Sequence, residues 1–164
     1  MVKRLFFVLV LCGIIPLCLV SCTKTESQQA TGSATFDFSL WDLRQNLVSL
    51  SDYRGKYPVI LFFWTTWCPY CREELLGLNE RNPRLVKEGW QVFAIDVGES
   101  ERRVRGYLEN SPLILRVLLD EDKQASRSFK VIGVPTFIFL GKEGEILFKG
   151  HSFPEHDYRE FIKH

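Results

Sequence analysis

The residues with the clearest capacity for chemistry are two cysteines, Cys68 and Cys71, separated by a proline and a tyrosine. Two thiols at this spacing can bind a metal ion, form a structural disulfide, react with peroxide, or alternate between dithiol and disulfide. A continuous apolar run, Val59–Trp64, precedes the pair, and a charged pattern with helical periodicity follows it. The other cysteines and the surrounding elements must decide among these chemistries.

The start of the chain has the layout of a bacterial export signal. A basic beginning leads into an apolar stretch over residues 5–20, which is shorter than the ~20 residues of a membrane-spanning helix and contains Gly13 and Pro16. The segment Leu19–Cys22, "LVSC", resembles the lipobox, where cleavage before the cysteine accompanies its lipid modification. We therefore expect a lipoprotein signal peptide at 1–21, with an uncleaved anchor or an ordinary secreted form as alternatives.

This interpretation determines which cysteines remain as thiols in the exported domain. The chain has 5 cysteines, of which two leave with the signal and Cys22 carries lipid, so Cys68 and Cys71 remain as the only thiols. The exported domain would then have no structural disulfide framework, although it works where disulfides form readily. We expect it to lie in the cell envelope, lipid-anchored to a bacterial membrane and facing outside the cytoplasm.

The remaining chain is expected to contain a tether and one domain. Residues 22–34 are polar and short of large apolar side chains, which is typical of a flexible tether behind the lipidated cysteine. An apolar content of 46% and an aromatic content of 13% are sufficient for a core within 35–164. The formal net charge of +1 offers no electrostatic case for a nucleic-acid partner.

The order of apolar patterns predicts an α/β architecture. Two short alternating segments suggest an N-terminal hairpin, and later runs alternate between buried-strand and helical patterns. We expect strands near 36–40, 47–50 and 59–64, a helix from 69, a strand at 90–97, a helix capped by Ser100, a strand at 116–119, a helix at 123–129, two strands around the 141–144 turn, and a final helix at 155–163. A thioredoxin fold with an N-terminal β-hairpin and a central β/α insert is the simplest match.

The two cysteines occupy different places in this plan. Cys68 stands where the buried strand ends, and Pro69 suits the first turn of the following helix. Unpaired N–H groups and the positive end of the helix dipole would face the sulfur of Cys68 and favour its thiolate. Cys71 lies one turn inside the helix, close enough to attack a mixed disulfide on Cys68 but less exposed to partners. We predict that Cys68 attacks and that Cys71 resolves.

The stretch "FFWTTWCPYCREE" (62–74) with the downstream "GVPTFIF" (133–139) resembles the TlpA/ResA/DsbE-like branch of the thioredoxin superfamily. These are membrane-associated thiol-disulfide oxidoreductases of bacteria, and the resemblance covers roughly 34–164. It implies protein disulfide substrates, a membrane thiol electron donor, no cofactor and no metal, and we expect a monomer. It also implies that the direction is more often reductive, for instance toward apocytochrome c thiols during haem attachment, although the sequence does not fix the direction.

The same resemblance assigns substrate-binding residues. Pro135 would be the cis-proline of the fold, beside the dithiol, and Val134 would offer its backbone to an extended substrate segment. An ordinary trans proline at the start of a strand is the alternative. Trp67 is expected to shield the sulfur of Cys68 and to form part of the docking surface, whereas Trp64 is expected to pack in the core or under the site.

One acid after the dithiol is a candidate for proton transfer. At 100° per residue, Glu74 lies about 60° from Cys71 around the helix, whereas Glu73 lies about 160° away. ResA-like proteins carry an active-site glutamate at the position of Glu74, and Phe62 stands where thioredoxin has a buried aspartate. The alternative for Glu74 is a solvated carboxylate on the helix surface.

A zinc site is a weak alternative for the cysteine pair, because zinc needs two further ligands and no other thiol remains. His151 and His156 are separated by a suitable spacing, but they follow the cysteines by about eighty residues, far more than in a zinc finger. These two histidines and His164 are therefore interpreted as exposed surface residues.

Three other functions stay open. A thiol peroxidase matches Thr65-x-x-Cys68, half of the peroxiredoxin motif, but Leu61 stands where that motif has a proline. A copper-handling protein of the Sco type has one more residue between its cysteines than this chain. A non-catalytic adaptor domain would not need the intact dithiol.

Overall fold

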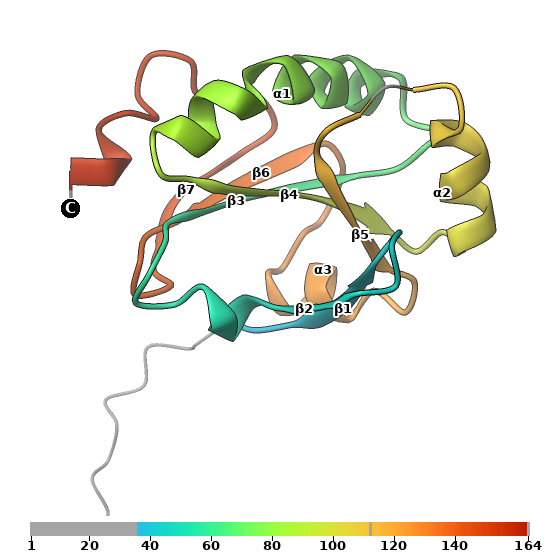
Figure 1. Cartoon of the computed structure of the whole chain (residues 1–164), viewed down its shortest axis with the longest axis horizontal. Helices are drawn as coiled ribbons and strands as arrows, with labels where there is room; N and C mark the ends of the chain where they lie inside the picture. The colour runs from blue at the N-terminus through green and yellow to red at the C-terminus, as the bar shows by residue number, and fades with distance from the viewer. Residues whose placement is uncertain (1–35, 112, 164) are drawn as a thin grey trace, which may run out of the picture. The chain divides into compact units, whose positions relative to one another are not determined.

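A seven-stranded mixed sheet is the framework of residues 36–111 and 113–163, the part of the chain that this computed structural model describes (Figure 1). Its strands, in the order β2-β1-β5-β4-β3-β6-β7, are flanked by three α-helices. The strands are β1 (Ser39–Asp42), β2 (Leu47–Ser49), β3 (Val59–Trp64), β4 (Gln91–Val97), β5 (Arg116–Asp120), β6 (Thr136–Leu140) and β7 (Ile146–Gly150). The helices are α1 (Pro69–Lys87), α2 (Glu101–Leu108) and α3 (Gln124–Ser128), with short 3-10 helices η1 (Leu50–Asp52) and η2 (Phe161–Lys163).

The strand pairing confirms the expected thioredoxin-type arrangement. β3, β4 and β5 are parallel neighbours, and β6 and β7 continue the sheet antiparallel beyond β3. The N-terminal hairpin of β1 and β2 joins the opposite side, where β1 pairs antiparallel with β5. The insert between β4 and β6 consists of α2, β5 and α3. Parallel β3 and β4 end at the same edge of the sheet, which brings the segments that follow them together.

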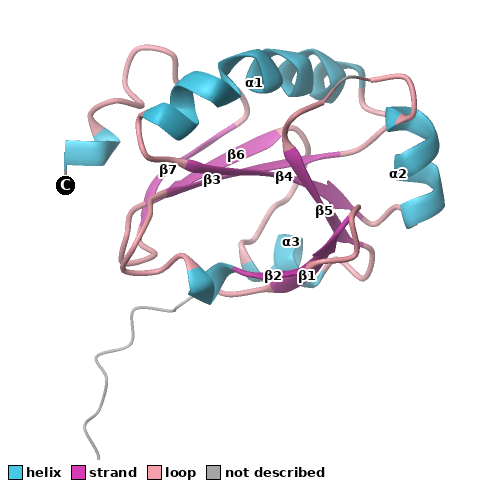
Figure 2. Ribbon diagram, in the orientation of Figure 1, coloured by secondary structure: helices cyan, strands magenta, loops and turns pink. Residues whose placement is uncertain are grey.

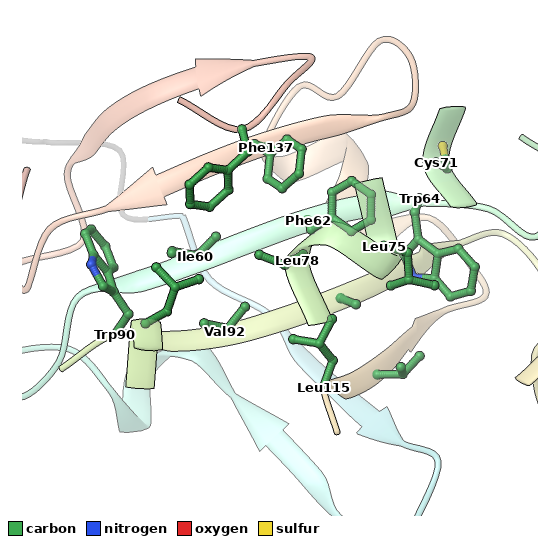
Figure 3. Packing of buried hydrophobic residues seen from close by; sticks show 14 of the residues in the cluster. Ile60, Phe62, Trp64, Cys71, Leu75, Leu78, Trp90, Val92, Leu115 and Phe137 are labelled. Atoms are coloured by element: carbon green, nitrogen blue, oxygen red, sulfur yellow. The ribbon is translucent and has the colours of Figure 1, made fainter. Parts of the chain in front are cut away.

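Each face of the sheet carries its own apolar layer, and α1 and α2 lie on one face while α3 lies on the other (Figure 2). All six residues of β3 are buried, and alternate side chains enter opposite layers. Figure 3 shows part of the first layer, in which Ile60 and Phe62 of β3 lie beside Leu75 and Leu78 of α1. This packing fixes α1, and with it the dithiol, against the end of β3.

Two aromatic residues close to the cysteine motif belong to this layer. Phe62 is fully buried and stacks on Phe137 with ring centroids 4.5 Å apart. Trp64 is also fully buried and contacts Tyr107 of α2 at 5.8 Å between centroids. The expectation that Trp64 packs in the core is therefore confirmed.

The prediction of a final helix at 155–163 is wrong. The segment after β7 runs through turns, and only η2 has helical hydrogen bonding. Phe153 and Tyr158 are both buried and contact each other, and their spacing of five residues does not follow one helical face. The Tyr158 hydroxyl also donates to Glu88 at the end of α1. These side-chain contacts outweigh local helix propensity.

The strand expected at 36–40 begins later, at Ser39. Phe36 and Phe38 precede it and pack against Phe129 beyond α3, with ring centroids 5.0 and 6.3 Å away. Their alternation therefore reflects burial under a neighbouring element and not membership of the strand.

The predicted signal peptide at 1–21, the lipidated Cys22 and the tether at 22–34 lie outside the described residues, as does His164. None of the helices described within 36–163 has the length and apolar character needed to cross a bilayer.

Candidate active site

Cys68 occupies the N-terminal cap of α1. Its backbone is extended, Pro69 takes the first helical position, and its sulfur accepts a hydrogen bond from the backbone N–H of Cys71 at 3.3 Å. The thiol of Cys68 also lies 3.9 Å from the carbonyl oxygen of Val134. Both cysteines are present as free thiols. The sulfur of Cys68 thus stands between a helix N-terminus, which favours negative charge, and a backbone carbonyl of the opposite loop.

Cys71 is more deeply placed than Cys68. Its side chain is fully buried, whereas 6% of Cys68 remains exposed. Burial, reinforced by its hydrogen bond with the Cys68 side chain, raises the pKa of Cys71 to about 12. Cys71 is therefore a neutral thiol at neutral pH, and it needs a proton acceptor before it can attack. This geometry fits the predicted order, in which Cys68 attacks and Cys71 resolves.

The loop opposite the dithiol contains a cis peptide bond between Val134 and Pro135, as predicted. Both residues are half-buried, and the Val134 carbonyl faces Cys68. His151, which follows β7, places its Nδ1 atom 2.8 Å from the carbonyl oxygen of Pro135. His151 is exposed, as expected, but its contact with the cis-proline was not foreseen because the register between β6 and β7 was unknown.

Large apolar side chains are exposed beside the dithiol and the cis-proline. Trp67, predicted to contribute to docking, is 59% exposed. Tyr70, in the first turn of α1, is 73% exposed, and Ile132, two residues before Val134, is 95% exposed. These exposed side chains offer apolar contact to a partner that approaches the dithiol. The exposure of Tyr70 and Ile132 was not predicted, although Tyr70 lies between the two cysteines and Ile132 directly precedes the downstream motif.

Glu74 and Glu73 differ in burial as their helical positions predict. Glu74 is half-buried and Glu73 is exposed. Burial raises the pKa of Glu74; the charge of Arg81 opposes this shift, and the charges of Glu155 and Glu73 reinforce it. No hydrogen bond joins Glu74 to either cysteine in the described part of the chain, so its role in proton transfer stays a prediction.

A second group of polar residues, missed in the sequence, lies under the loop that leads to Cys68. Glu99 is buried, and its carboxylate accepts hydrogen bonds from the backbone N–H and the hydroxyl of Thr66. Asp96, at the end of β4, is fully buried, and burial raises its pKa to about 8. The available signal was the Asp-x-x-Glu spacing directly after a buried strand, since that strand ends beside the one that leads to the cysteines.

No metal-binding cluster emerges from these residues. Across residues 36–111 and 113–163, no group of three or more histidine, cysteine, aspartate or glutamate side chains is arranged to hold a metal ion. His156 is an exposed residue of the segment after β7.

Comparison with known sequences gives consistent matches. Residues 31–149 match the AhpC/TSA family. The thiol-disulfide oxidoreductase ResA of Geobacillus kaustophilus is 35% identical over 147 residues, which cover 89% of this chain and 84% of that protein. ResA of Bacillus subtilis is 31% identical over 136 residues, covering 80% of this chain and 75% of that protein.

Solved structures agree on the fold. A thiol:disulfide interchange protein DsbE from Chlorobium tepidum superposes with a TM-score of 0.67 at 27% identity, covering 76% of this chain and 87% of that chain. StoA from Bacillus subtilis has the same TM-score of 0.67 at 19% identity, over 79% of this chain and 98% of that chain. At that identity, StoA supports the fold alone.

Proposed function

Because the chain belongs to the AhpC/TSA family and is a thiol-disulfide oxidoreductase of the TlpA/ResA/DsbE-like thioredoxin branch, we propose that it reduces protein disulfides outside the cytoplasm. The observation that carries this proposal is the pairing of two unequal thiols at one helix N-terminus. Cys68 caps α1 and lies 3.9 Å from the Val134 carbonyl, whereas Cys71 is fully buried behind it. One thiol is placed to meet a partner and the other to release it.

The reaction proceeds in two exchanges. The Cys68 thiolate attacks one sulfur of a substrate disulfide, the substrate S–S bond breaks, and the first substrate sulfur leaves as a thiolate that takes up a proton. Cys71 then loses its proton and attacks the sulfur of Cys68, which forms the Cys68–Cys71 disulfide and expels the second substrate thiolate. Two electrons pass from the dithiol to the substrate.

The second exchange needs a base, and we assign this role to Glu74. A carboxylate with an ordinary pKa is a weak base toward a thiol, but burial raises the pKa of Glu74 and thereby its basicity. Glu74 follows Cys71 by three residues on α1, which places both on neighbouring parts of the helix surface.

Substrate proteins would bind in extended form along the cis-proline loop. The Val134 backbone supplies hydrogen-bonding groups beside Cys68, and the exposed ring of Trp67 supplies apolar contact. This arrangement recognises the backbone and the general shape of the substrate, so it tolerates different sequences around the target disulfide.

The cellular setting follows from the start of the chain. Residues 1–21 act as a lipoprotein signal peptide, Cys22 carries lipid, and 22–34 tether the monomeric domain to the membrane. A membrane thiol electron donor restores the dithiol after each turnover. Apocytochrome c, whose cysteines must be reduced before haem attachment, is the substrate class that best fits the family resemblance.

A trapping experiment tests the exchange mechanism. A Cys71→Ala variant lacks the resolving thiol, so mixed disulfides through Cys68 accumulate and can be identified by mass spectrometry after expression in the native host. The double variant Cys68→Ala/Cys71→Ala is the matched control and captures nothing. Absence of adducts, together with an unreactive Cys68 at neutral pH, would refute the mechanism.

Two further measurements separate the alternatives. Equilibration with thiol-disulfide redox buffers gives the reduction potential, and a reductant should lie closer to the about −270 mV of thioredoxin than to the about −120 mV of DsbA. Consumption of hydrogen peroxide tests the peroxidase alternative, which the AhpC/TSA match keeps relevant. Turnover with peroxide faster than with protein disulfides would favour that alternative.

A further inference from the structure

The carboxylate of Glu99 holds the peptide that leads into the redox motif. Glu99 Oε2 accepts the backbone N–H of Thr66 at 2.5 Å, and Oε1 accepts the Thr66 hydroxyl at 2.8 Å. Both residues are buried, with 7% of Glu99 and 6% of Thr66 exposed. Thr66 precedes Cys68 by two residues, so its position determines where the cap of α1 begins. A buried, charge-assisted pair of hydrogen bonds is a strong constraint on that position.

Two arginines hold the same threonine from other directions. Arg72 of α1 donates from Nε to the Thr66 carbonyl oxygen at 2.9 Å. Arg103 of α2 donates from Nε to the Thr66 hydroxyl at 3.3 Å and pairs with Glu99 Oε1 at 2.6 Å. Every backbone and side-chain polar group of Thr66 is thereby bonded to residues from three separate segments. Such a set of hydrogen bonds holds Thr66 in one position, as the support of a functional site requires.

A second carboxyl group lies against Glu99. Asp96 pairs with Trp64 in the parallel register of β4 and β3, and its Oδ1 accepts the backbone N–H of Glu99 at 3.2 Å. Asp96 is fully buried, and its Oδ2 receives no hydrogen bond from any described residue. A proton on Asp96 would be donated to the carboxylate of Glu99, with whose side chain it interacts.

The charges around Asp96 favour this protonated form. Burial, followed by interaction with the Glu99 side chain, raises the pKa of Asp96 to about 8, and the charge of Asp120 on β5 adds to the shift. Arg103 on α2 is bound to Glu99, and the Lys123 side chain lies against Gly98 between the two acids.

Burial alone would raise the pKa of Glu99, but its hydrogen bonds with Thr66 and Asp96 and the charge of Arg103 lower it. The pair therefore carries one proton at neutral pH.

We propose that Glu99 is a positioning residue for the dithiol, acting through Thr66, and that Asp96 stores the proton that keeps this carboxyl pair at a single negative charge. When Asp96 loses that proton, two adjacent carboxylates repel each other beneath Thr66 and loosen the start of the Cys68 cap. The inference rests on disulfide exchange through Cys68, and it adds a buried, pH-sensitive support on the β4 side of the site.

The first test separates positioning from folding. Glu99→Ala removes both acceptors of Thr66 and should lower kcat/KM for reduction of insulin disulfides about tenfold, because small displacements at a reacting centre are costly. Glu99→Gln keeps one oxygen acceptor for the Thr66 N–H and should stay within about threefold of wild type. Asp157→Asn, an exposed carboxyl in the segment after β7, is the matched control and should match wild type.

Thermal melts of all variants confirm that each is folded at the assay temperature. Glu99→Ala activity equal to wild type in a folded protein would overturn the positioning role. Failure of the wild type itself to reduce insulin would instead count against the proposed function, so the two failures are distinguishable.

The second test follows the proton on Asp96. The wild type and Asp96→Asn are alkylated with iodoacetamide across the pH range around 8. The rate at Cys68 is followed through the peptide that contains this residue. Asparagine cannot ionise, so the ratio of wild-type to variant rates should be constant below about pH 7 and fall at least about twofold by about pH 9. Dividing the two rates removes the pH effects that are common to both proteins. A ratio that does not change with pH would overturn the role of Asp96.

Discussion

Two acidic regions near the dithiol differ in exposure and in their partners. On α1, Glu74 is half-buried; burial raises its pKa, and the charge of the neighbouring Arg81 opposes that shift. Under the Thr66 loop, Glu99 and Asp96 are buried, and Glu99 is bonded directly to the backbone. A carboxyl that moves protons needs access to its partner and to water, whereas a carboxyl that positions a loop needs fixed hydrogen bonds. The two regions therefore support different tasks at one site.

The largest expected effect concerns stability in the buried region. In the folded protein the pKa of Asp96 is raised from 3.8 to about 8. The neutral form of Asp96 contributes fully to the free energy of unfolding below about pH 4. This contribution is lost as the pH rises toward about 8. The loss amounts to several kcal/mol, at ~1.4 kcal/mol per pKa unit. Asp96→Asn should flatten this slope of the unfolding free energy, as measured by urea denaturation at several pH values.

Glu74→Gln is the matched comparison for that experiment. The half-buried Glu74 carboxyl should affect the pH slope of the unfolding free energy much less than Asp96 does, because solvent screens its charge. Equal flattening by both substitutions would remove the distinction between the two regions.

The next effect concerns release of the mixed disulfide. Glu74→Gln removes the proposed proton acceptor of Cys71 and should slow the resolving step about 100-fold, the range of general base catalysis. Glu99→Gln should leave this step nearly unchanged. The measurement is the decay of a preformed mixed disulfide between Cys68 and a small aromatic thiol, followed by absorbance. Slower decay in Glu99→Gln than in Glu74→Gln would reverse the assignment of roles.

The smallest effect concerns the charge beside Glu74. Arg81 lowers the pKa of Glu74 and forms an ion pair with Glu155 on the surface. Arg81→Gln should raise the pH at which the resolving step reaches half of its maximal rate, because Glu74 then ionises at higher pH. The unfolding free energy should change by less than about 1 kcal/mol, as expected for a surface ion pair. An unchanged pH profile of the resolving step would contradict an influence of Arg81 on the ionisation of Glu74.

The parts that could be predicted from the sequence follow from periodicity and spacing. The run Val59–Trp64 identified a buried strand, and the proline after Cys68 identified the helix start. The cis-proline at Pro135 was predicted by resemblance to a family and not by local physics. The different burial of Glu73 and Glu74 followed from the helical angle.

The parts that were missed depend on which segments become neighbours. Glu99 meets Thr66 only because β3 and β4 end side by side, and His151 meets Pro135 only through the register of β6 and β7. The final helix was mispredicted because the aromatic anchors Phe153 and Tyr158 override a short helical pattern. Such contacts between distant segments leave no periodic signal along the chain.

The most direct test of the central claim compares the two cysteines in one reaction. Purified Cys71→Ala and Cys68→Ala are each mixed with a disulfide-containing protein at neutral pH, and adduct formation is followed by intact mass. The unequal thiols predict rapid, stoichiometric adducts through Cys68 in Cys71→Ala and almost none through Cys71 in Cys68→Ala, because burial raises the pKa of Cys71 to about 12. Equal rates of adduct formation in the two variants would contradict the account.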